Sequence, residues 1–131
     1  MSLATSSLPG AVKDKEGTHP VAALWRPTIC AIVRAFVQGD YQVARAIPGV
    51  DPVSPETAEH IEANVAEYGA TLIELPDETW QTSVAQWMGD YWEVLVDLWT
   101  NAEGRSDLVL HLRVVEADGA ARFSVHLVYV P

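Results

Sequence analysis

Apolar residues follow a helical period in the first half of the chain. After Arg26-Pro27, apolar side chains recur three and four positions apart up to Gly39, which predicts a helix that starts with a proline in its first turn and stops at a glycine. Its expected inward positions are Ile29, Ile32, Val33, Phe36 and Val37. A short second helix or a turn is expected over residues 41–47.

The segment SPETAEHIEANVAEYG predicts the clearest helix of the chain. Ser54 is placed to cap its first turn, Pro55 suits the first helical position, and Gly69 follows the last turn. The expected inward stripe consists of Ala58, Ile61, Val65 and Tyr68.

The next stretch predicts a short strand and a third helix. The sequence ATLIEL is typical of a strand that ends at Pro76. After it, Trp80, Val84, Trp87 and Met88 fall at helical spacing before Gly89, and this spacing predicts a helix with Asp77 as its cap.

From residue 91 onward the period changes to two. Three segments, 92–99, 108–115 and 123–129, each have one uniformly apolar face, and we expect them to form an antiparallel meander. A loop at Ala102-Glu103-Gly104 predicts that Glu93 faces Arg113 and that Leu98 faces Leu108. The Asp118-Gly119 turn predicts the further pairs Val114 with Phe123, Leu110 with Leu127, and His111 with His126.

These elements predict an α+β fold, in which N-terminal helices pack on one face of a C-terminal antiparallel meander of three main strands and a short earlier strand. The length of 131 residues suits one domain. Residues 1–20 are polar and rich in Gly, Pro and Ser, so we expect a flexible tail there and a single domain over residues 21–131.

Charge and composition narrow the classes of function. The net charge is −10, and residues 46–104 hold twelve carboxylates and no Lys or Arg. Such a field repels phosphate backbones, so we expect no nucleic-acid partner, although it would speed association with a basic protein. No segment approaches the ~18 apolar residues of a membrane span. The chain has one cysteine, Cys30, and therefore no internal disulfide, which suits the cytoplasm. We expect Cys30 to be a small buried hydrophobic residue.

The sequence contains none of the familiar local motifs for nucleotide, zinc or acyl-transfer chemistry, so we expect no cofactor, no metal and no catalytic residue. One polar cluster follows from the expected registers, on the sheet face opposite the helices. Two imidazoles and a carboxylate there suit either metal binding or acid-base chemistry, whereas a half-solvated sheet face with a cross-strand ion pair is the structural alternative. The cluster consists of His111, His126, Arg113, Glu93 and Ser124.

Two further candidate sites are apolar or acidic. An apolar pocket under the sheet would be lined by Trp80, Trp87, Trp92 and Tyr129, although burial in the core alone explains the three tryptophans. Mixed aromatic, apolar and charged surfaces are typical of protein interfaces. The candidate interface residues are Trp99, Leu95, Glu56, Glu59 and Glu62.

The stretch VLVDLWTNAEGRSDLVLHLRVVEADGAARFSVHLVYVP, together with GDY after the first helix and PVSPE before the second, resembles a family of uncharacterised bacterial domains of unknown function. The resemblance covers about residues 25–131, and its most specific block is VDLWT followed by EGRSDL. It implies no catalytic residues. The layout is also similar to cystatin-like and nuclear transport factor 2-like folds, whose enzymes carry acid-base groups on the inner sheet face, where this chain has none.

We therefore expect a small, acidic, cytoplasmic protein that acts by binding another protein or a second copy of itself, in the manner of an immunity protein, an inhibitor or a dimeric interaction module. The alternative is a protein that binds a small molecule in an aromatic pocket, or a weakly marked enzyme that uses His111 and His126.

Overall fold

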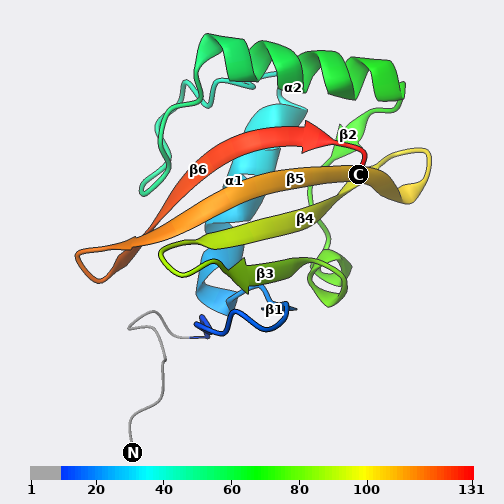
Figure 1. Ribbon diagram of the computed structural model, residues 1–131. Helices are drawn as coiled ribbons and strands as arrows, with labels where there is room; N and C mark the ends of the chain where they lie inside the picture. Colours follow the sequence, from blue (N-terminus) through cyan, green and yellow to red (C-terminus); the bar gives the residue numbers. More distant parts are fainter. Residues whose placement is uncertain (1–9) are drawn as a thin grey trace, which may run out of the picture.

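The computed structural model describes residues 10–131. Two helices pack on one face of a six-stranded antiparallel sheet in the order β1-β3-β4-β5-β6, and β2 pairs with the far end of β4 (Figure 1). The α+β class with an antiparallel sheet is therefore confirmed. The elements are β1 (His19–Pro20), the 3₁₀ turn η1 (Ala23–Trp25), α1 (Arg26–Val37), α2 (Pro55–Tyr68), β2 (Leu72–Ile73), the 3₁₀ turn η2 (Asp77–Gln81), β3 (Val84–Trp87), β4 (Trp92–Thr100), β5 (Gly104–Ala117) and β6 (Ala120–Tyr129).

Helix α1 has the expected start and four of its five expected buried positions. Pro27 lies in its first turn, and Ile29, Ile32, Val33 and Phe36 are buried. Val37 is 38% exposed, so its predicted inward position was wrong. Cys30 is only partly buried, although it packs against the core, and burial raises the pKa of its thiol.

Helix α2 matches its prediction from cap to cap. The Ser54 hydroxyl accepts a hydrogen bond from the Thr57 amide at 3.2 Å, and Gly69 ends the helix with a φ of +84°. Ala58, Ile61 and Val65 are buried, and Tyr68 packs against them at the edge of the core. Before α2, residues 41–47 form turns rather than a helix.

The predicted helix over residues 77–88 is wrong. The chain forms the short turn η2 and then the strand β3, which pairs with β4. The reason lies in hydroxyl groups that bond to β4: Thr79 donates to the Asp97 carbonyl at 2.6 Å, and Ser83 accepts from the Asp97 amide at 3.0 Å. These bonds across strands replace the local bonds of a helix, and Met88, expected inside, is 45% exposed.

The meander is present, and two bulges shift its registers. Glu93 faces Arg113 as expected, but an irregularity between Asp97 and Trp99 removes the predicted pairing of Leu98 with Leu108. The first hairpin loop spans residues 101–103, one residue earlier than expected, with Gly104 at a φ of +74°.

The second hairpin turns at Asp118-Gly119 as expected, both residues having positive φ, and Val114 faces Phe123. Between the pairs Leu112–Val125 and His111–Leu127, a bulge in β6 leaves His126 without a register partner in β5. As a result His111 faces Leu127 and Leu110 faces Val128, so the predicted pairs of His111 with His126 and of Leu110 with Leu127 were wrong. Val128 is fully buried, although the alternation placed it on the outer face.

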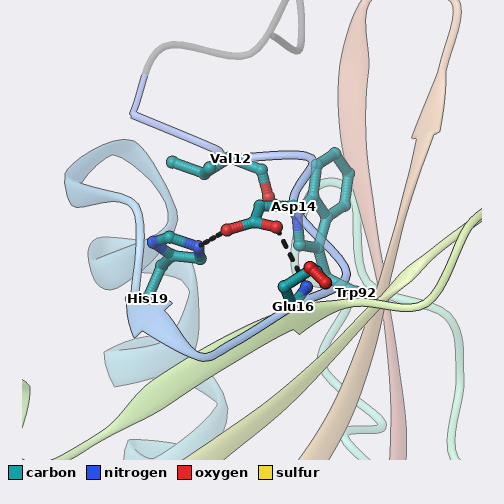
Figure 2. Close-up of polar contacts among 5 residues, drawn as sticks. All are labelled: Val12, Asp14, Glu16, His19 and Trp92. Carbon is teal, nitrogen blue, oxygen red and sulfur yellow. Dashed lines mark hydrogen bonds and ion pairs between the residues drawn. The ribbon is translucent and has the colours of Figure 1, made fainter. Parts of the chain in front are cut away.

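Residues 10–20 pack against the sheet, in contrast to the tail expected there. Ala11 is buried, and His19 and Pro20 form β1 beside β3. The indole of Trp92 donates to the Val12 carbonyl at 3.0 Å (Figure 2). We call residues 10–20 the N-terminal strap; residues 1–9 of the expected tail lie outside the described part of the chain.

Candidate functional site

The sheet face opposite the helices carries most of the polar candidates, and we call it the outer face. Figure 1 shows α1 behind the sheet and α2 along β6, while no helix lies over the side turned to the viewer. Alternation along the paired strands assigns the following side chains to the outer face: Val84, Gln86, Glu93, Leu95, Asp97, Trp99, Val109, His111, Arg113, Val115 and Ser124. Most are half-buried, and Val109 is only 8% exposed.

Glu93 is the centre of a charged cluster on this face. Its carboxylate accepts a hydrogen bond from His111 Nε2 and lies 3.3 Å from Arg113 Nε. The Arg113 guanidinium lies 4.6 Å from the centre of the Tyr91 ring. The Glu93 carboxylate thus lies between His111 and Arg113, and an aromatic ring covers the guanidinium.

The bulge in β6 places His126 beside His111, so His126 also belongs to this cluster. Its ring centroid lies 5.3 Å from that of His111, with an interplanar angle of 34°. Burial lowers the pKa of His126, and the nearby charges of Arg113 and His111 lower it further. Burial opposes ionisation of Glu93, but its hydrogen bond to His111 and the charges of His111 and Arg113 outweigh burial, so the pKa of Glu93 is lowered.

Ser124 faces Arg113 in the register but bonds elsewhere. Its hydroxyl donates to Asp51 at 3.0 Å, and the same carboxylate pairs with Arg122 at 2.6 Å. Ser124 is therefore an anchor for the loop before α2 rather than a member of the Glu93 cluster. Sequence reasoning missed Asp51 and Tyr91, because their contacts join residues with no shared motif.

The two apolar interface candidates lie on the outer face. Leu95 sits in β4 between Val84 and His111 of the neighbouring strands. Trp99 lies at the end of β4 against Gly104, where an added Cβ would be 3.5 Å from the ring. Its indole Nε1 is buried and has no hydrogen-bond partner among the described residues.

The acidic interface candidates occupy a different surface. Glu56, Glu59 and Glu62 are exposed along α2. Glu59 and Glu62 border a surface pocket of about 480 Å³, which Asp40 and Tyr41 close on the other side. The structure does not bring these carboxylates to the outer face.

Only two of the four residues of the expected apolar pocket come together. Trp87 and Trp92 are neighbours on the helix-facing side, with ring centroids 4.5 Å apart, and Trp80 instead lies under the Arg26 guanidinium at 5.4 Å. Tyr129 faces Val109 and lines a separate surface pocket of about 390 Å³ beside α2.

Within residues 10–131 no group of three or more His, Cys, Asp or Glu side chains is arranged to hold a metal ion. His111 and Glu93 form a hydrogen-bonded pair beside Arg113 on the outer face rather than in a cleft. None of the helices described is long and apolar enough to cross a membrane.

A family model described as a domain of unknown function, DUF7668, matches residues 33–131. The chain belongs to this family. The matched DUF7668 region includes α2, all strands from β2 to β6 and the whole Glu93 cluster, and it starts within α1. The expectation of an uncharacterised family is therefore confirmed, and the N-terminal strap lies before the matched region. No curated protein and no solved structure matches the chain.

Proposed function

We propose that this DUF7668 protein is a non-catalytic interaction module that pairs with a second copy of itself through the outer face of its sheet. The observation that supports this most directly is a half-buried face, mixed in aromatic, apolar and charged groups, with no element of the described chain lying over it. Such mixed composition is typical of interface surfaces.

Parts of both edges of the sheet are already bonded, which favours the outer face over the edges as the surface for a second copy. The edge of β6 is bonded by the segment before α2: the Asp51 amide donates to the Phe123 carbonyl at 2.9 Å, and the Phe123 amide donates to Gly49 at 2.8 Å. Further along, Asn64 of α2 donates to the Val128 carbonyl at 2.8 Å. At the other edge, β1 pairs with β3. Addition of a partner strand is therefore disfavoured at these positions.

The charges of the outer face favour a second copy as its partner. The chain carries a net charge of −10, so most pairs of surfaces from two copies repel each other. On the outer face Glu93 is balanced by Arg113, and Asp97 lines a surface pocket together with Arg105. At the border of this face Asp51 balances Arg122. Two such faces can approach at the ~10 Å spacing of packed sheets without a net like-charge penalty.

Sedimentation of the full chain tests this proposal. We expect a concentration-dependent dimer at micromolar protein, and we expect Leu95→Glu to shift it to a monomer because the new carboxylate is buried against an identical face. A wild-type monomer at all accessible concentrations would contradict the proposal.

The acidic side of α2 supports a second candidate, an inhibitor-like function toward a basic protein. Its motivation is the run of exposed carboxylates at Glu56, Glu59 and Glu62, of which Glu59 and Glu62 line a pocket of about 480 Å³. Charge reversal at Glu59 and Glu62 would abolish such binding and leave dimerisation through the outer face unchanged. For both candidates we propose a cytoplasmic location, which the single Cys30 favours.

A further inference from the structure

We propose that Trp87, Trp92 and Glu116 form a binding site for organic ammonium groups, and that Lys13 of the N-terminal strap occupies this site as an internal ligand. The Lys13 ammonium lies 5.1 Å from the centre of the Trp87 ring and 6.0 Å from that of Trp92. It also lies 3.0 Å from the Glu116 carboxylate. Two indole faces and a carboxylate around one ammonium are the groups that recognise organic ammonium ligands in proteins.

The walls of this ammonium site are positioned by the sheet and the core rather than by Lys13. Trp87 and Trp92 face each other in the register of β3 and β4, with a ring spacing of 4.5 Å. Trp92 is 1% exposed and packs edge-on against Trp25 at 5.2 Å. Glu116 belongs to β5. Removing the Lys13 side chain should therefore leave the walls in place.

The occupant comes from the strap, whose strand β1 lies at the edge of the sheet. Apart from Lys13, the strap is attached by the two residues of β1, by the buried side chain of Ala11 and by the bond from Trp92 to Val12. Its own turn is held by Asp14, which accepts from the Glu16 amide at 2.9 Å and pairs with His19 at 3.1 Å (Figure 2).

The strap also carries both lysines of an otherwise acidic chain. The second, Lys15, lies against the β3–β4 loop, where a Cβ on Gly89 would be 3.3 Å from its Cε. Of the two lysines, Lys13 is the one whose ammonium lies over the Trp87 and Trp92 rings, so Lys15 offers a matched control.

The ligand class follows from the lining. Two aromatic faces favour a cation that is weakly hydrated, and the carboxylate adds charge selectivity, so the site suits an ammonium carried by a small molecule or by a lysine side chain. Because the ammonium site lies on the helix-facing side of the sheet, it is independent of the proposed dimer face.

Tryptophan fluorescence of the full chain tests the proposal, with choline as the probe of a small-molecule ammonium and Nα-acetyl-lysine methylamide as the probe of a lysine side chain. Lys13→Ala should bind one of the two ammonium probes about tenfold more tightly than the wild type binds it. The same variant should bind that probe about tenfold more tightly than it binds the neutral tert-butyl analogue of choline. Lys15→Ala keeps the Lys13 ammonium in the site, so it should bind both probes as weakly as the wild type does.

A second measurement separates binding from a loss of folding. The same ammonium probe should raise the Tm of Lys13→Ala and not that of the wild type, and Glu116→Gln added to Lys13→Ala should abolish the rise. If Lys13→Ala fails to fold, Lys13→Met keeps the apolar stem and takes its place. An equal response to choline and to its neutral analogue, or no saturable response to either ammonium probe, would show that Lys13 is only a clamp and would overturn the proposal.

Discussion

His111 and His126 lie with their rings 5.3 Å apart although the strands do not pair them. His111 faces Leu127 in the register, and the bulge in β6 brings His126 beside it. Because Arg113 is close to both imidazoles, protonation of His126 adds a positive charge to a cluster that holds one carboxylate, Glu93.

This arrangement predicts a loss of stability on mild acidification. The pKa of His126 is lowered in the folded chain, so between its ordinary value of 6.5 and the lower folded value the unfolded state binds more protons. The contribution of neutral His126 is fully present above pH 6.5 and is lost as the pH falls through the folded pKa. Urea unfolding of the wild type and of His126→Gln, compared across pH, checks this.

We expect the difference in unfolding free energy between these two proteins to be constant above pH 6.5 and to move in favour of His126→Gln below it. A difference that stays flat through this range would refute the role of His126. At lower pH, protonation of Glu93, whose pKa is also lowered, should destabilise both proteins alike.

The turn between β5 and β6 predicts a backbone effect. Gly119 has a φ of +78°, and no atom lies near an added Cβ, so Gly119→Ala should be destabilised by backbone strain alone, by about 1 kcal/mol. Gly17→Ala is the matched control, because Gly17 also has open space around it but has no positive φ. Equal stability of the two variants in urea would contradict the assigned turn.

The bond from Asn64 to the β6 edge predicts a modest stability effect. Asn64→Ala removes the partner of the Val128 carbonyl and should lower the free energy of unfolding by about 1 kcal/mol. Glu67→Ala, an exposed change on the same helix, is the control and should shift stability by less than about 0.5 kcal/mol. Hydrogen exchange should also show faster exchange in β6 of Asn64→Ala; unchanged exchange and stability would mean that the edge is protected by other contacts.

The parts of the fold that local chemistry determines could be predicted from the sequence. Ser54 and Gly69 set the ends of α2, and Asp118-Gly119 sets the last turn, because each acts on neighbouring backbone groups. The predicted helix over residues 77–88 failed because the spacing of Trp80 and Trp87 also suits a short turn followed by a strand.

Long-range features could not be predicted in this way. A bulge moves one residue out of the alternation and leaves the sequence pattern on either side intact, so nothing local marks His126. The contact of Lys13 with Glu116 joins residues at opposite ends of the chain. The Glu93 and Arg113 pair was correctly expected, because the irregularity between Asp97 and Trp99 takes up two residues of β5 and so offsets the earlier position of the hairpin loop.

The most direct test of the proposed dimer compares two valines with the same exposure. Val115 lies on the outer face and Val37 lies on α1, and each is 38% exposed, so replacement by Glu should affect folding of the monomer to a similar degree. Sedimentation equilibrium of both variants is the measurement. The proposal predicts that Val115→Glu is monomeric while Val37→Glu keeps the wild-type dimer; equal self-association of the two variants would contradict it.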